Sequence, residues 1–182
     1  MRLEQSCPFC RKAGPETEEE WGKLKMNRIE TNDPVAMIDE GVEQYENKNY
    51  IKAVEYWSKA AALGNADAHC KLAVMYRDGL GVERDKGKEM HHLEEAAIGG
   101  HPNARYFLGR EEFANGNTER AVKHCIIGAT QGCEFSMRAL MTAFKGGRIS
   151  KVDLAATLRE HQATVDATKS PQRETAAQYH PC

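Results

Sequence analysis

The 182-residue chain has no long apolar run, and no stretch approaches the roughly 20 apolar residues that a membrane-spanning helix needs. Its first residues, Met1 to Ser6, also lack the apolar core of a secretory signal peptide. The charge is nearly balanced, with 25 lysines and arginines against 27 acidic residues, whereas binding to nucleic-acid phosphates needs a basic surplus. We therefore expect an intracellular protein, cytoplasmic with the nucleus as an alternative, that binds neither membranes nor nucleic acids.

The sequence also lacks the short motifs of common catalytic chemistries. It contains no His-Glu-x-x-His, no Gly-x-Ser-x-Gly and no phosphate-binding Gly-Lys-Ser/Thr. The adjacent pairs His91–His92 and His124–Cys125 lie in expected helices, where consecutive side chains diverge and do not form a metal site or a nucleophile–base couple. We expect no catalytic residue. The alternative is a small helical enzyme that uses His91, His124 or Cys125.

Six cysteines are present, and only Cys7 and Cys10 form a motif. The other four are scattered, as expected for small buried side chains rather than for a disulfide framework. Two thiolates at this spacing can bind one zinc ion, but zinc needs four ligands and no second pair follows nearby. A redox dithiol has the same spacing, and an inert pair is a further alternative. No cofactor is expected unless the zinc site is complete.

Three segments end in the same pattern of small residues and a closing glycine, at Gly64, Gly100 and Gly132. A small residue lies four positions after each of these glycines, and an equivalent small residue occurs once earlier in the chain. These four small residues are 32, 36 and 32 positions apart. The longer interval contains a longer loop, which changes the entropy of loop closure only slightly. Such spacing is typical of repeat proteins, in which each unit buries its apolar face against its neighbours.

Each unit has the pattern of a helix hairpin. In the second helix of the first unit, Ala53, Trp57 and Ala61 recur at helical spacing and form one apolar stripe. The closing glycines suit the left-handed residue that ends a helix, and Asn65-Ala66 suits a helix start. The sequence therefore predicts an all-α fold, an α-solenoid of stacked antiparallel helix hairpins with Trp57 in its core.

These landmarks resemble the Sel1-like repeat, a relative of the tetratricopeptide repeat, over roughly residues 33–162. The first unit departs from the pattern at Glu40, where a leucine is expected, and at Gln44, where an aromatic residue is expected, so its first helix is expected to pack loosely or in a shifted register. The resemblance implies a non-catalytic scaffold or adaptor with protein or peptide partners. The matching residues of the middle unit are Ala68, Leu72, Ala73, Tyr76, Gly79, Gly81, Val82, Asp85, Lys88, Ala96, Ala97, Gly99 and Gly100, and those of the third unit are Ala104, Leu108, Gly109, Ala121, Ala129 and Gly132.

The segment Cys7-Pro8-Phe9-Cys10-Arg11 resembles the last ligand pair of a RING finger. Algal-type proteins join such a finger directly to Sel1-like repeats, and the resemblance extends to residues 151–154 and 169–173. In that family the rest of the finger precedes this motif, whereas this sequence begins at its end, through a late start or a lost finger. The resemblance implies zinc binding by Cys7 and Cys10 only with a finger upstream. The alternative function is then the substrate-recruiting part of a RING-type ubiquitin ligase.

These patterns divide the chain into four parts. They are a RING remnant at 1–14, an N-terminal capping helix at 15–32, the repeats at 33–149, and C-terminal capping helices with a tail at 150–182. The repeats are expected at 33–65, 66–101 and 102–134, with a degenerate unit at 135–149.

The two capping segments are expected to cover the ends of the solenoid. In the first, Trp21, Leu24 and Ile29 are the expected inward residues, with a solvated charged helix as the alternative. In the second, Ser150 and Asp153 have the spacing of a capping box at a helix start. Its expected inward residues are Leu154, Leu158, His161, Gln162 and Val165.

The first helices of a stacked array form a curved inner face that can hold an extended peptide. Helix phase places Glu43, Met75 and Arg105 on this face as candidate contact residues, with ordinary solvation as the alternative.

Overall fold

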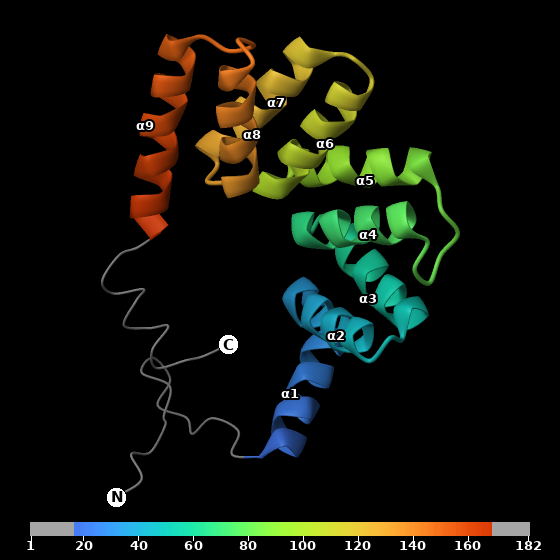
Figure 1. Ribbon diagram of the computed structural model, residues 1–182. Helices are drawn as coiled ribbons and strands as arrows, with labels where there is room; N and C mark the ends of the chain where they lie inside the picture. The colour runs from blue at the N-terminus through green and yellow to red at the C-terminus, as the bar shows by residue number, and fades with distance from the viewer. Residues whose placement is uncertain (1–16, 169–182) are drawn as a thin grey trace, which may run out of the picture.

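The computed structural model describes residues 17–168, and this part of the chain consists of nine α-helices without strands (Figure 1). The helices are α1 (Glu18–Glu30), α2 (Pro34–Glu46), α3 (Tyr50–Ala62), α4 (Ala66–Asp78), α5 (Lys86–Ile98), α6 (Pro102–Ala114), α7 (Thr118–Thr130), α8 (Glu134–Lys145) and α9 (Lys151–Thr168). Helix α2 pairs with α3, α4 with α5, and α6 with α7, and the hairpins follow one another along an arc (Figure 1). Helix α8 packs on α7, and α9 lies against both.

The helix ends have the backbone conformations that the sequence predicts. The side chains of Asp33 and Asn65 accept hydrogen bonds from amides of the following first turn, at 2.9 and 3.0 Å. These bonds satisfy amide groups that have no partner within the helix. Gly64, Gly100 and Gly132 have φ angles of +79°, +83° and +91°, a left-handed conformation that costs glycine little.

The first hairpin is closely packed, which corrects the expectation of a loose or shifted first helix. Trp57 is 3% exposed, and its indole lies directly against the backbone of Gly41, so close that a Cβ atom on Gly41 would overlap the ring. The indole N–H donates to the carbonyl of Ile38 at 3.4 Å. The glycine in α2 therefore makes room for the largest side chain of α3.

The departures at Glu40 and Gln44 have a structural reason. The Gln44 amide donates to the Glu40 carboxylate at 2.8 Å, and the Lys25 ammonium of α1 lies 2.6 Å from the same carboxylate. Burial alone would raise the pKa of Glu40, but hydrogen bonds from Lys25 and Gln44 outweigh it and lower the pKa. Glu40 thus binds α1 to the first hairpin where other units place a leucine.

The predicted inward face of α1 is wrong at two of its three residues. Trp21 is 57% exposed and Leu24 is 42% exposed, whereas Ile29 packs against the core around Trp57. Helix α1 is attached near its C-terminal end and through the Lys25 ion pair, so its first turns leave apolar side chains in solvent.

The inward face of α9 also differs from the prediction. Leu154 and His161 are buried as expected, but Leu158 is 39% exposed and Gln162 is exposed. Thr157 is buried instead. The face that packs inward is therefore more polar than an apolar periodicity can indicate.

This polar face covers the C-terminal end of α7. The His161 ring lies 2.8 Å from the Ala129 carbonyl through its Nδ1 atom, and the Thr164 hydroxyl donates to the Thr130 carbonyl at 2.8 Å. The last carbonyls of a helix have no partner within it, and α9 supplies donors to two of them. The Ser150 side chain starts α9 by accepting from the Asp153 amide at 3.1 Å, as predicted.

Candidate binding surface

The sequence-predicted site residues are scattered over the molecule. Cys7 and Cys10 lie outside the described residues, as does the segment from residue 169 onward. Among residues 17–168, no group of three or more histidine, cysteine and acidic side chains could hold a metal ion. Within the same range, no helix has the length and apolar character to cross a bilayer.

The three predicted contact residues have different surroundings. Glu43 is exposed and pairs with Lys25 at 2.5 Å, so its predicted role in binding stays open. Met75 is 1% exposed and belongs to the core around Trp57, which makes its prediction as a contact residue wrong. Arg105 is half-buried, and its guanidinium donates to the Ala97 carbonyl at 3.4 Å, on the preceding hairpin. Helix phase alone does not identify the exposed positions here, because Met75 faces the neighbouring hairpin.

The histidine pairs in adjacent positions form no catalytic couple, but His92 has a partner that sequence reasoning missed. Its Nδ1 atom lies 3.0 Å from Nδ1 of His69, and its ring stacks on Tyr76 with an interplanar angle of 11°. His69 Nε2 lies 3.2 Å from the Ala61 carbonyl, which can only accept. His69 therefore donates through Nε2 and accepts from the Nδ1–H of His92.

Cys125 is buried, which raises the pKa of its thiol to about 11. The thiolate is the nucleophilic form of cysteine, so this side chain stays protonated at neutral pH. Burial also lowers the pKa of the adjacent His124, and no hydrogen bond joins the two side chains in the described part of the chain. This geometry does not favour the alternative of a helical enzyme.

Helices α6 and α8, with the loop after α8, carry a surface rich in aromatic and arginine side chains, which sequence reasoning also missed. The Tyr106 and Phe135 rings are 5.6 Å apart, and the Arg138 guanidinium lies 5.0 Å from the Phe135 ring centre. Phe113 and Phe135 are 50% and 49% exposed. We call this the aromatic–arginine surface, and it consists of Tyr106, Phe107, Arg110, Phe113, Phe135, Arg138 and Arg148.

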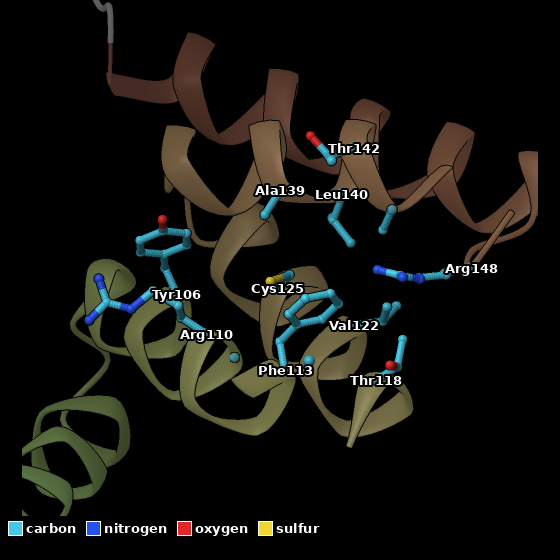
Figure 2. Close-up of a pocket in the computed structure, with 13 residues that line it drawn as sticks. Tyr106, Arg110, Phe113, Thr118, Val122, Cys125, Ala139, Leu140, Thr142 and Arg148 are labelled. Carbon is cyan, nitrogen blue, oxygen red and sulfur yellow. The ribbon is translucent and has the colours of Figure 1, made fainter. Parts of the chain in front are cut away.

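A cavity of about 250 Å³ opens within this surface, between α6, α7 and α8, and we call it the α6–α8 pocket. Figure 2 shows Tyr106 and Arg110 at one end, Arg148 and Thr118 at the other, and Cys125 between them. The deepest side chains are buried and mostly apolar, whereas the rim is exposed. The buried lining comprises Gly109, Ala121, Cys125 and Leu140, and the exposed rim comprises Arg110, Phe113, Thr142 and Arg148.

Arg148 gives the rim of the α6–α8 pocket a positive charge. Its guanidinium lies 4.9 Å from the centre of the Phe113 ring, and within residues 17–168 no carboxylate lies at salt-bridge distance from it. The nearby Asp153 is hydrogen-bonded to the Ser150 hydroxyl at 2.7 Å. In the described part of the chain, the pocket thus combines an apolar interior with a cation that has no carboxylate partner.

The comparison with protein families finds the Sel1 repeat, whose model matches residues 38–65, 66–101 and 102–133. Among solved structures, a Sel1 repeat protein from Oxalobacter formigenes is 23% identical with a TM-score of 0.68, over 80% of this chain and 63% of that chain. The c5321 protein, a protective antigen of uropathogenic Escherichia coli strains that displays an SLR fold, is 20% identical with a TM-score of 0.61, over 90% of this chain and 36% of that chain.

These identities show the fold alone, and they confirm the predicted all-α solenoid of helix hairpins. The chain spans 63% of the length of the first solved protein and 36% of the second.

Proposed function

Because this chain belongs to the Sel1 repeat family, we propose that it is a non-catalytic adaptor that holds a protein or peptide partner. Stacked helix hairpins commonly present an extended surface to a partner, and this architecture has no need of a reactive side chain. The raised thiol pKa of Cys125 and the engagement of His92 with His69 support a role without catalysis.

The aromatic–arginine surface is the observation that supports this proposal most strongly. Residues that dominate binding energy at interfaces are enriched in tryptophan, tyrosine and arginine, and they cluster around pockets. Here Arg110 and Arg138 lie over the rings of Phe107 and Phe135, which holds both aromatic and cationic groups in place before a partner arrives. Ordering these groups in advance reduces the entropy that binding would otherwise cost.

Selection of peptides from a random phage library against the full chain, followed by calorimetric titration, tests the proposal. We expect Phe135→Ala to weaken the selected peptides at least about tenfold, the effect of losing a central aromatic contact. Ile98→Ala is the matched control, because Ile98 is an apolar residue of α5, 76% exposed and outside this surface. Failure to enrich any peptide, or equal effects of the two substitutions, would contradict the proposal.

The ligase alternative depends on Cys7 and Cys10, which lie outside the described residues. No contact within residues 17–168 favours it, and zinc binding by this pair therefore stays a prediction. Zinc titration of the full chain would measure metal binding. The absorbance of a cobalt-substituted sample would then show directly whether thiolates are the ligands.

A further inference from the structure

The α6–α8 pocket occupies the same place in the solenoid as the core around Trp57. The repeat intervals of 32 and 36 residues together span 68 residues. Each position of the groove between α2, α3 and α4 is therefore equivalent to the position 68 residues later, in the groove between α6, α7 and α8. Trp57 corresponds to Cys125, and Met75 corresponds to Ala143. Trp57 and Met75 fill the groove between α2, α3 and α4. Their counterparts Cys125 and Ala143, in the groove between α6, α7 and α8, are small.

The backbone confirms that these positions are equivalent. The amide of Leu80 donates to the Met75 carbonyl at 3.2 Å, and the amide of Arg148 donates to the Ala143 carbonyl at 2.9 Å. The same hydrogen bond therefore closes α4 and α8. Leu80 packs on the core around Trp57, whereas Arg148 lines the pocket.

The third groove keeps the features that accommodate an indole in the first. Gly109 corresponds to Gly41, the glycine that makes room for the Trp57 ring, and a Cβ atom on Gly109 would lie 3.1 Å from both the Cys125 sulfur and the Ala121 carbonyl oxygen. Phe113 corresponds to Tyr45, whose ring centre lies 5.8 Å from that of Trp57. The α6–α8 pocket thus has the glycine and the neighbouring ring of a tryptophan site, without the tryptophan.

The volume of the pocket suits an aromatic group. An engineered apolar cavity of about 150 Å³ is large enough to bind benzene, and this pocket measures about 250 Å³. Its opening at the protein surface lets a side chain enter from outside, because Phe113 and Arg148 at the rim are exposed. Because no carboxylate of residues 17–168 pairs with the Arg148 guanidinium, this group favours a partner that carries a carboxylate next to the ring.

We propose that the α6–α8 pocket receives a tryptophan side chain from within a partner peptide, and that an acidic residue beside this tryptophan pairs with Arg148. The inference deepens the proposed adaptor function and rests on it. An internal residue fits better than a chain end, because surface residues for further contacts lie on both sides of the pocket, with Tyr106 at one end and Arg148 at the other (Figure 2).

Titration of the full chain with short capped peptides, followed by amide chemical shifts, tests this proposal. The probes are acetyl-Glu-Trp-Glu-amide, its glutamine counterpart acetyl-Gln-Trp-Gln-amide, and acetyl-Glu-Ala-Glu-amide. We expect the first probe to perturb the amides of Cys125, Ala139 and Ala143. The glutamine probe should bind about two- to fivefold more weakly, as for an exposed ion pair, and the alanine probe at least about tenfold more weakly.

Two substitutions separate the apolar and ionic parts of the site. Cys125→Trp supplies the missing indole from the chain itself, so we expect it to abolish binding of the tryptophan probes. Arg148→Gln should leave tryptophan binding in place and make the glutamate and glutamine probes bind equally. Arg159→Gln is the matched control, since Arg159 is an exposed arginine of α9 outside the pocket, and it should change neither affinity nor preference.

Several outcomes would overturn the proposal. A folded Cys125→Trp protein that still binds the probes would do so, as would equal binding of the tryptophan and alanine probes. If Cys125→Trp does not fold, Ala143→Met fills the pocket with the side chain of Met75 and must weaken binding at least fivefold.

Tighter binding of N-acetyl-tryptophan than of the tripeptide would indicate that the pocket binds a chain end. Chemical-shift changes of pocket amides with protein concentration alone would indicate that a second copy of this chain occupies the pocket. Both results contradict an internal partner residue.

Different experimental results would contradict the pocket proposal and the adaptor proposal. If the probes do not bind but library peptides bind through Phe135, the adaptor function stands and the pocket proposal falls. If the probes bind but no library peptide is enriched, the adaptor proposal loses its support and the pocket remains as a small binding site.

Discussion

Trp57, Leu93 and Cys125 occupy the same position in the three second helices, and their decreasing size determines how each groove is filled. Trp57 contacts the backbone of Gly41 and stands near Tyr45, so its removal leaves a large cavity in a closely packed site. Cys125 also packs against its glycine, Gly109, but it is a much smaller side chain and borders an open pocket, so fewer contacts are lost with its sulfur atom. The same repeat position therefore contributes different amounts to the free energy of unfolding in different units.

We expect Trp57→Ala to lower the free energy of unfolding by about 3–5 kcal/mol, as for other large truncations in cores. Cys125→Ala should lower it by less than about 1 kcal/mol, because the site is already partly empty. Urea unfolding followed by circular dichroism measures both changes. A small effect of Trp57→Ala would mean that the groove between α2, α3 and α4 is not closely packed.

At the scale of helices, α1 is joined to the solenoid by charge as much as by apolar contact. Lys25 lies 2.6 Å from Glu40, whose side chain is almost buried, while Trp21 and Leu24 remain exposed. A buried carboxylate without its partner destabilises a protein, whereas an apolar replacement of both partners is often neutral or better. The stability of the fold around Glu40 therefore depends on Lys25 of α1.

The substitution Lys25→Ala should lower the free energy of unfolding by about 1–2 kcal/mol, because Gln44 is then the one side chain of residues 17–168 that donates a hydrogen bond to Glu40. The double substitution Lys25→Met with Glu40→Leu should restore the loss, because it replaces the pair by apolar side chains. Chemical denaturation of the single and double variants gives both values. Additive losses in the double variant would argue against the pairing.

A second link between helices is the hydrogen bond of His69 in α4 with His92 in α5. Burial, and to a lesser extent the neighbouring His69 and His91, lower the pKa of His92 to about 4. The folded protein therefore holds His92 neutral at a pH where the unfolded chain, with an ordinary pKa near 6.5, binds a proton. His92 therefore costs no stability above pH 6.5, and the free energy of unfolding falls as the pH drops from 6.5 toward 4, because the unfolded chain binds the proton more readily.

Between pH 7.5 and 5.5, we expect His92 to account for a loss of about 1 kcal/mol, after allowance for its partial exposure. His92→Tyr, which places in α5 the residue that α3 has at Tyr56, should reduce this pH dependence. His91→Tyr is the control, because His91 is an exposed neighbour on the same helix. Burial also lowers the pKa of His101 and His124, so part of the slope should remain. Equal slopes in both variants would contradict the assignment.

For the whole molecule, the sequence predicts the helix hairpins well because glycines and small residues recur at fixed intervals. It predicts surfaces less well. Met75 looks accessible from its own helix, and only the neighbouring hairpin reveals its burial. The α9 face differs from the apolar pattern because Thr164 and His161 bind carbonyls of α7, a contact that apolar periodicity does not register. The α6–α8 pocket leaves a signal in the sequence, the loss of size from Trp57 to Cys125, but only once units are compared position by position.

The unequal filling of the grooves should produce a gradient of local stability along the solenoid. In such an array each unit contacts only its neighbours, so a poorly filled groove weakens its own hairpins without affecting distant ones. The groove of α2, α3 and α4 contains Trp57 and Met75, whereas the groove of α6, α7 and α8 contains a cavity of about 250 Å³.

We expect amide hydrogens of α7 and α8 to exchange at least about tenfold faster than those of α3 and α4, because they open at a lower free energy. Cys125→Trp should slow exchange in α6–α8 and leave α2–α4 unchanged. Native-state hydrogen exchange measured by mass spectrometry resolves both regions in one experiment. Uniform protection along the chain would mean that the solenoid opens as one cooperative unit, and that the cavity does not weaken its C-terminal hairpins.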